Sequence, residues 1–186
     1  MKVSLYLTLG LVIVGMVIGA LFGYYLTPED RLSMYEKNAM SLGPADRTFD
    51  LRYINAMAAH HREAILLAEK LGKNTRRPEM QDLSRKILSD EPKLIDELYA
   101  WKNDWYGDTR KVREPIAANL GPADDTFDLR FLNAMIAHHE AGIAMTKETR
   151  LKSSRAEILN NADAVEAFLT NGIKALKELR SIWYNL

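Results

Sequence analysis

The sequence predicts an all-α fold, a four-helix bundle made of two repeated helical hairpins that one transmembrane helix precedes. Two observations lead to this prediction. The first is an uncharged apolar run near the N-terminus, and the second is an internal repeat with a spacing of 78 residues. Apolar residues recur at three- and four-residue intervals in both copies, which is the period of an amphipathic helix.

The N-terminal segment, residues 1–28, is predicted to be a membrane anchor. Its apolar core from Leu5 to Leu26 has about the 20 residues that a helix needs to cross a bilayer. A cleaved signal peptide is the alternative, although its apolar region is usually only about 7–15 residues long. Lys2 precedes the span and no positive excess follows it. The positive-inside rule therefore favours a cytoplasmic N-terminus and an extracytoplasmic domain, in a periplasm, a lumen or the cell exterior.

Glycines at four-residue intervals line one face of this span, at Gly15, Gly19 and Gly23. Such a face lets a second helix approach closely, so it indicates a transmembrane helix partner. Glycine is also common in membrane helices, and that interpretation stays open.

Composition excludes several classes of function. The chain carries 25 acidic and 25 basic residues, so nothing indicates binding to nucleic acid. It has no cysteine, which excludes disulfides, thiolate metal sites and a cysteine nucleophile.

The internal repeat aligns Gly43–Tyr106 with Gly121–Tyr184 without a gap. The first 19 positions, GPADRTFDLRYINAMAAHH and GPADDTFDLRFLNAMIAHH, agree at 15, whereas the next 45 agree at only seven. Each copy is interpreted as a helical hairpin, and the two together as one four-helix domain. The predicted segments are a stalk at 29–42, a first hairpin at 43–106, a linker at 107–120 and a second hairpin at 121–186.

Glycine and proline mark the expected interruptions of the first hairpin. Gly72 and Pro78 predict the turn between its two helices. Pro92 follows Glu91 within the second helix, and it predicts a kink or a break there.

All four histidines of the chain occur as two adjacent pairs, His60-His61 and His138-His139. Each pair follows a methionine, Met57 or Met135, by three and four residues, so thioether and imidazoles share one helix face. Adjacent histidines point about 100° apart and do not chelate one ion as an i, i+4 pair does. We therefore expect one histidine of each helix to face the interior, so that His61 meets His139 or His60 meets His138.

Two imidazoles and two thioethers would make a soft site. Thioether ligands favour Cu(I) over Zn(II), and suit its heavier analogue Ag(I). Core packing is the alternative, because a buried neutral imidazole bonded to Asp50 or to a carbonyl gives the same pattern. Asp50 and Asp128 are interpreted as first-turn acids that the helix dipole favours, rather than as ligands.

An enzyme is not expected. A carboxylate-bridged di-iron bundle needs Glu-x-x-His motifs, and the sequence has none; Glu63 follows His60, and its counterpart is Ala141. A nucleophile elbow, a phosphate loop and a zinc-protease helix are also missing from the sequence.

The run from Asp128 to Met145, D-x-x-F-L-x-x-M-I-x-H-H-x-x-G-I-x-M, resembles the signature of the family called domain of unknown function 305. The resemblance extends from Gly43 to Tyr184. It implies a ferritin-like fold, tandem repetition, export, and binding of copper or silver by some members. Carried over by position, it implies a set of metal ligands: Met57, His60, His61, Met135, His138, His139 and Met145.

The sequence departs from the family pattern at three places. Leu67 stands where the second copy has Met145. Members commonly carry Gln-x-x-Glu-Ile on the second helix of each copy. Here these places hold Glu91-Pro92-Lys93-Leu94-Ile95 and Leu169-Thr170-Asn171-Gly172-Ile173.

Two functional hypotheses follow. The first is a membrane-anchored extracytoplasmic protein that buffers or hands over copper or silver through methionine and histidine side chains. The second is a non-enzymatic accessory or assembly subunit of a membrane protein complex, with the bundle as a docking module.

Overall fold

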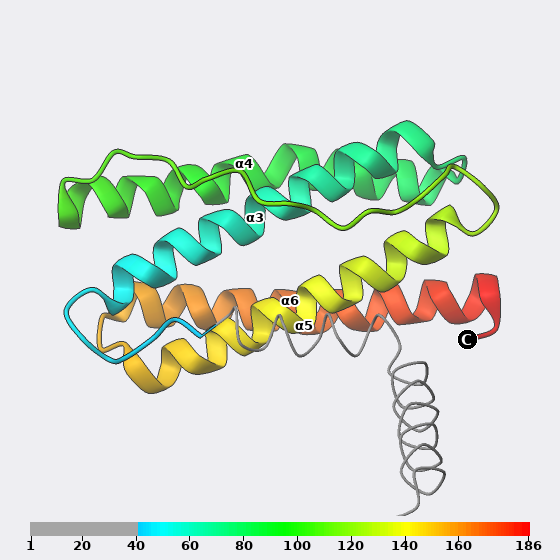
Figure 1. The fold of residues 1–186 in the computed structure, drawn as a ribbon. Coiled ribbons are helices and arrows are strands. Elements are labelled where there is room, and N and C mark those ends of the chain that lie inside the picture. The colour runs from blue at the N-terminus through cyan, green and yellow to red at the C-terminus, as the bar shows by residue number, and fades with distance from the viewer. Residues whose placement is uncertain (1–40) are drawn as a thin grey trace, which may run out of the picture. The chain divides into compact units, whose positions relative to one another are not determined.

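The computed structural model of the chain describes residues 41–186 and shows four helices, labelled as in Figure 1. They are α3 (Phe49–Asn74), α4 (Pro78–Tyr106), α5 (Phe127–Lys152) and α6 (Ala156–Tyr184). Within the described residues there is no β-strand. The prediction of an all-α fold with four helices is therefore confirmed.

The predicted anchor, residues 1–28, lies outside the described residues, as do its glycine face and nearly all of the predicted stalk. Among residues 41–186, no helix combines the length and the apolar character that a membrane crossing requires. The transmembrane helix stays a prediction from the sequence.

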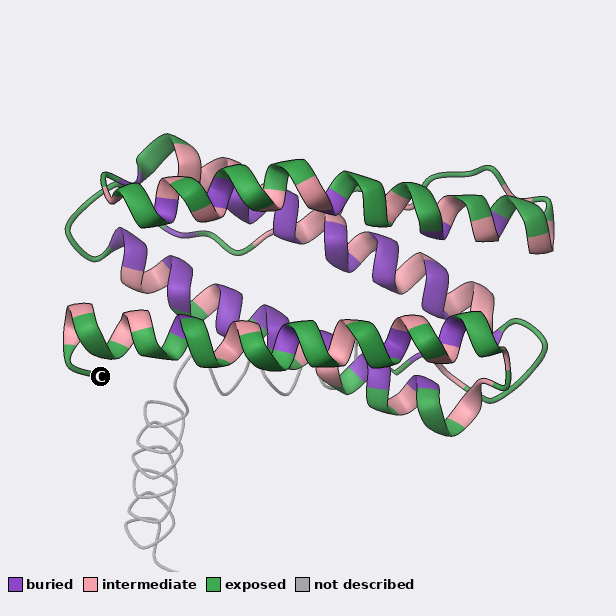
Figure 2. Cartoon of the chain, turned by 180° about the vertical axis from the view of Figure 1, so that it is seen from behind, coloured by how far each residue is buried: buried purple, intermediate pink, exposed green. Residues whose placement is uncertain are grey.

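The two hairpins meet through their first helices. Helix α3 packs along α4 and α5 packs along α6, while α3 and α5 cross each other and join the two repeats. Buried residues accordingly gather on α3 and α5, whereas α4 and α6 expose more of their surface (Figure 2). Helices α4 and α6 have little direct contact.

The apolar core forms two clusters, and each draws residues from both repeats. The first core cluster comprises Leu42, Phe49, Tyr53, Ile54, Met57, Ala58, Leu98, Met145, Ile158 and Ala162. The second core cluster comprises Leu67, Leu71, Met80, Leu120, Phe127, Phe131, Leu132, Met135, Ile136 and Leu176. Because neither repeat completes a cluster alone, the two hairpins form one folded unit.

The most similar part of the repeat, GPAD-x-TFDLR, fastens the loop that leads into each first helix. The Asp46 carboxylate accepts hydrogen bonds from the backbone amide and the hydroxyl of Thr48, both at 2.8 Å. The Arg52 guanidinium donates to the carbonyls of Leu42 and Pro44. The second copy repeats these bonds through Asp124, Thr126, Arg130, Leu120 and Pro122. Part of the similarity between the copies thus serves local structure.

Of the interruptions expected in the first hairpin, the turn is confirmed: it lies at residues 75–77, and Pro78 begins α4. Helix α3 continues through Gly72 to Asn74. A Cβ atom at Gly72 would lie 2.7 Å from the Ser84 hydroxyl of α4, so this glycine permits close packing of the two helices. Helix α4 continues through Pro92, and the predicted break is wrong. The carbonyl that Pro92 leaves without a donor belongs to Leu88, a residue that is 38% exposed.

The segment that connects α4 to α5 runs back along the first hairpin. The Arg62 guanidinium donates to the Glu114 carboxylate at 2.7 Å. The Lys70 ammonium donates to the carbonyls of Ala117 and Ala118 at 3.3 and 2.8 Å. These bonds fix the start of α5 relative to α3.

Candidate functional site

The four histidines form a continuous row where α3 and α5 cross. The rings of His60 and His138 are stacked, with centroids 3.7 Å apart and planes 4° from parallel. His61 lies beside His60 at 6.2 Å, and His139 lies beside His138 at 6.0 Å. Of the two pairings that the sequence allowed, the structure brings together His60 and His138. We call the four rings the histidine row.

Two rings of the row contact carboxylates. The Nδ1 atom of His61 lies 2.5 Å from the Glu91 carboxylate of α4, and both side chains are largely buried. The Nδ1 atom of His138 lies 3.5 Å from the Glu63 carboxylate of α3. A carboxylate at one ring nitrogen fixes the orientation of an imidazole and leaves its other nitrogen available as a ligand.

The other two rings lack such partners. The Nε2 atom of His60 and the Nδ1 atom of His139 are buried without a hydrogen-bond partner. Burial, followed by the charge of neighbouring His138, holds the pKa of His60 well below its usual range. The same two causes lower the pKa of His139 to about 4. Both imidazoles are therefore neutral at physiological pH, which is the form that binds metal ions.

Two mid-helix glycines make room for these two rings. A Cβ atom at Gly142 of α5 would lie 2.7 Å from Nε2 of His60. A Cβ atom at Gly172 of α6 would lie 2.6 Å from Nε2 of His139. Since glycine weakens a helix interior by roughly 1 kcal/mol relative to alanine, its presence at both places reflects the space that the rings occupy.

The three candidate methionines lie on the two sides of the row. Met57 and Met145 share the first core cluster, whereas Met135 belongs to the second core cluster with Leu67. All three methionines are almost completely buried. The thioethers of Met57 and Met135 thus do not converge on one point, and Met57 is grouped with Met145 instead.

The row in this conformation is not a closed metal site. A metal ion binds in the plane of an imidazole, and one ion cannot lie in the planes of two parallel stacked rings at once. Within residues 41–186, no group of three or more His, Asp or Glu side chains is arranged to hold an ion. Binding of one ion by both His60 and His138 therefore requires one ring to turn out of the stack.

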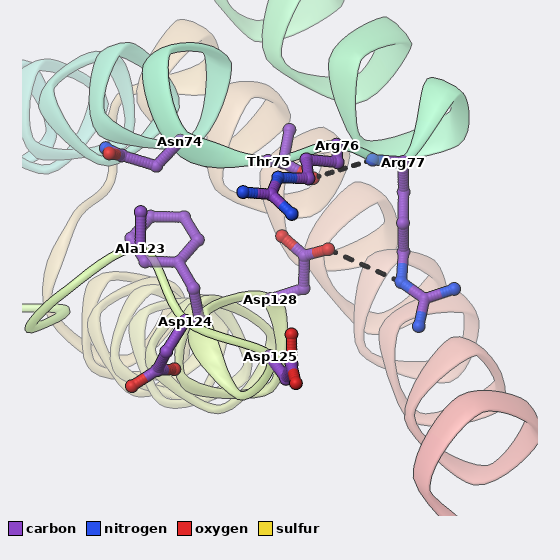
Figure 3. Close-up of a pocket in the computed structure, with 9 residues that line it drawn as sticks. Asn74, Thr75, Arg76, Arg77, Ala123, Asp124, Asp125 and Asp128 are labelled. Carbon is purple, nitrogen blue, oxygen red and sulfur yellow. Dashed lines mark hydrogen bonds and ion pairs between the residues drawn. The ribbon is translucent and has the colours of Figure 1, made fainter.

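Asp50 and Asp128 lie in the first turns of α3 and α5, away from the row, and each contacts the other repeat. Asp50 accepts a hydrogen bond from the Ser153 hydroxyl at 2.7 Å and contacts Arg155 at 3.4 Å. Asp128 forms an ion pair with Arg77, at 3.4 Å, beside a cavity of about 350 Å³ (Figure 3). The two aspartates therefore fasten the hairpins to each other.

The row lies at the base of a groove between α4 and α6. This cavity of about 770 Å³ is lined by residues of all four helices, including the four histidines. Its walls are mostly apolar, and Phe168 on α6 is 59% exposed. We call it the α4–α6 groove.

Four residues that contact the row were not predicted from the sequence: Glu63, Glu91, Gly142 and Gly172. Glu91 and Gly172 both stand at departures from the family pattern, Glu91 opposite Leu169 and Gly172 opposite Leu94 in the repeat. The available signals were a carboxylate on the apolar face of α4 and a glycine within a helix. Neither signal identifies a histidine as the contact, because the contact depends on how the helices pack.

Comparison with solved structures finds similar chains, among them several forms of a protein titled CopM. The structure titled "CopM in the Cu(I)-bound form" has a TM-score of 0.64 and 28% sequence identity, over 73% of this chain and 97% of that one. "CopM in the Ag-bound form (by co-crystallization)" has a TM-score of 0.64 at 27% identity, with the same coverage. "CopM in the apo form" has a TM-score of 0.64 at 28% identity, and covers 73% and 98% of the two chains. A search among curated proteins finds no match.

A family model described as "Domain of unknown function (DUF305)" matches residues 50–180. The match includes all four helices in whole or in part, the histidine row and the three candidate methionines. The chain belongs to this family.

Proposed function

We propose that this protein binds copper, with silver as an analogue, through the histidine row and its flanking methionines, and buffers or hands over the ion. The observation that carries the proposal is the row itself. Four imidazoles lie side by side in the interior, and two of them have a buried ring nitrogen without a partner. A core built only for stability leaves few such nitrogens unpaired.

The chemistry of the donors favours a soft monovalent ion. The low pKa of His60 and His139 means that metal binding displaces no proton from these rings. Thioethers on both sides of the row suit Cu(I) and Ag(I) better than Zn(II). The similar structures add support, because their titles name Cu(I)-, Cu(II)- and Ag-bound forms of CopM.

Titration of the full chain with Cu(I), in competition with a chromogenic Cu(I) chelator, tests the proposal. We expect stoichiometric binding that a variant with all four histidines changed to glutamine lacks. Circular dichroism checks that the variant remains helical. The changed positions are His60, His61, His138 and His139. Equal affinity of both proteins for Cu(I) would refute the proposal.

Matched methionine variants test the thioether contribution separately. Met57→Leu removes a sulfur beside the row, whereas Met80→Leu removes one from the second core cluster at a position that is not a candidate ligand. We expect Met57→Leu to weaken binding of Cu(I) more than binding of Zn(II), and Met80→Leu to change neither. The same loss in both variants would show that thioethers act only through packing.

The proposal also includes the membrane anchor at residues 1–28 and an extracytoplasmic position of the bundle. Its support is the uncharged apolar sequence and the placing of Lys2 before it. Since the chain has no cysteine, Ser154→Cys provides a single thiol for a membrane-impermeant maleimide. We expect labelling on intact cells, and retention in the membrane after carbonate washing. Labelling only after cell lysis would show that the bundle lies on the cytoplasmic side, opposite to the proposed orientation.

An accessory or assembly role in a membrane complex is the second candidate. The observation that favours it is the face formed by Gly15, Gly19 and Gly23 in the sequence. Extraction in mild detergent followed by sizing should then yield a complex with a stoichiometric partner. A lone monomer would exclude this role.

A further inference from the structure

We propose that the α4–α6 groove is a binding site for an apolar organic cation, such as an aromatic phosphonium or a quaternary ammonium compound. The proposal does not depend on copper binding. It starts from the separation of α4 and α6, which leaves a cavity of about 770 Å³. That volume lies within the range of about 300–1,000 Å³ that small-molecule sites occupy.

The groove is elongated, and its two ends differ in chemistry. Its α4 wall runs from Leu83 to Trp101, which corresponds to about 27 Å of helix. Near Leu83, the facing residues of α6 are Leu176 and Leu179, in and beside the second core cluster. This end is apolar and offers no polar side chain to a ligand.

The opposite end combines aromatic and acidic side chains. Trp101 and Glu97 of α4 line the end of the groove near the first turn of α6, which carries Glu157. Glu97 and Glu157 are exposed carboxylates, and the exposed Phe168 lies midway along the α6 wall, beside His139. Aromatic faces together with carboxylates are the groups that bind organic cations.

The charge of the groove is one-sided. Its 23 lining residues, all within the described part of the chain, include Glu91, Glu97 and Glu157 but no lysine or arginine. The whole chain, by contrast, has 25 residues of each sign. The α4 lysines Lys86 and Lys93 are paired with Asp90 rather than directed into the groove. A cation in the groove therefore meets carboxylates in the lining and no lysine or arginine among the lining residues.

Tetraphenylphosphonium and tetraphenylborate form a matched pair of probes, because they have the same shape and opposite charge. Equilibrium dialysis of the metal-free full chain in phosphatidylcholine nanodiscs, corrected for empty nanodiscs, measures the binding of each probe. We expect one phosphonium ion per chain, and binding of the borate that is weaker by about tenfold or more.

Three variants locate the site. Glu97→Gln together with Glu157→Gln should weaken phosphonium binding about tenfold, because two nearby charges are lost. Phe168→Ala should weaken it about fivefold through loss of an aromatic face. These residues are exposed, so the fold should persist. The control, Asp96→Asn together with Glu178→Gln, removes the same charge from exposed positions outside the groove and should change affinity less than about twofold.

Equal binding of both probes would overturn the proposal, since only apolar character would then select the ligand. Phosphonium binding that the groove variants leave unchanged would overturn it as well. Absence of binding, with the chain dimeric in sedimentation, would assign the groove to a second copy of the chain. Absence of binding by a monomer would equally reject the cation site. Because the histidines are untouched in all variants, failure here leaves the Cu(I) titration as an independent test.

Discussion

Replacing Gly142 by alanine tests how tightly the histidine row is packed. In an ordinary helix interior this change would stabilise the protein by about 1 kcal/mol. Here the new Cβ atom would lie 2.7 Å from Nε2 of His60 and 2.5 Å from Cδ1 of Leu169, whereas ordinary contact begins near 3.4 Å. Both neighbours must move by more than half an ångström.

The two neighbours differ in their freedom to move. The Leu169 methyl group ends a flexible side chain, but the His60 ring is buried and stacked on His138. Overpacking of this kind costs about 1–3 kcal/mol, which outweighs the gain in helix propensity. We therefore expect Gly142→Ala to lower the free energy of unfolding by about 1 kcal/mol. In a His60→Ala background the imidazole no longer obstructs the new Cβ atom. Gly142→Ala should then raise the free energy of unfolding by up to about 1 kcal/mol.

Urea unfolding of the four proteins, followed by far-ultraviolet circular dichroism, completes the double-mutant cycle. The expected coupling between positions 60 and 142 is about 2 kcal/mol. Ala167→Gly, at an exposed position of α6, calibrates the effect of helix propensity alone. If Gly142→Ala stabilises the protein equally in both backgrounds, the His60 ring does not occupy the space beside Gly142.

Three further changes probe other features of the fold. The pKa of His139, about 4 in the folded protein against an ordinary 6.5, means that the unfolded chain takes up the proton first. Stability should therefore be complete above pH 6.5 and fall towards pH 4, by at most about 3 kcal/mol. His139→Gln should remove this component when urea unfolding is compared across the range; an unchanged profile would contradict it. Pro92→Ala should stabilise the protein by about 1–3 kcal/mol, because α4 regains a backbone hydrogen bond. A lower urea midpoint would show instead that the proline ring supports the packing. Asp50→Ala should cost about 1 kcal/mol more than Asp128→Ala in the same assay, since only Asp50 accepts a bond from Ser153. Equal losses would mean that the Ser153 contact contributes nothing.

The sequence was sufficient to predict the four helices and to limit the histidine contact between the repeats to two possible pairings. The period of apolar residues determines which face of each helix is buried, and the repeat implies a pseudo-twofold relation between α3 and α5. Where two such helices cross, only residues at the crossing contact the residues at the equivalent positions of the other copy. His60 and His138 lie at this crossing, so the stack was one of two pairings that the sequence offered.

The same geometry explains why the methionines do not converge. Helices α3 and α5 cross with opposite directions, so residues before the crossing on one helix meet residues after it on the other. Met57, three residues before His60, shares its cluster with Met145, seven residues after His138. Its equivalent, Met135, joins Leu67 instead. A comparison of equivalent positions in the two copies does not show that Met57 is grouped with Met145 rather than with Met135.

The contacts of α4 and α6 with the histidine row could not be predicted from the sequence. The repeat retains seven identities over its last 45 positions, so α4 and α6 place different groups against the same row. Glu91 contacts His61, whereas the equivalent Leu169 contributes only hydrocarbon. Gly172 admits the His139 ring, whereas its equivalent is Leu94. These differences depend on side-chain packing between helices, which periodicity does not specify.

The state of the row bears on whether an ion would be structural or transferable. A structural metal site is closed by its ligands and contributes the folding energy of its domain. Here two apolar clusters flank the row, and each joins residues of both repeats. The rings of the row pack against each other and against Gly142 and Gly172. Binding of one ion by both His60 and His138 must break their stack, and this opposing free energy lowers the affinity relative to a preformed site. Because breaking the stack costs free energy, the ion is bound less tightly and is released more readily. The proposed buffering and handover require such release.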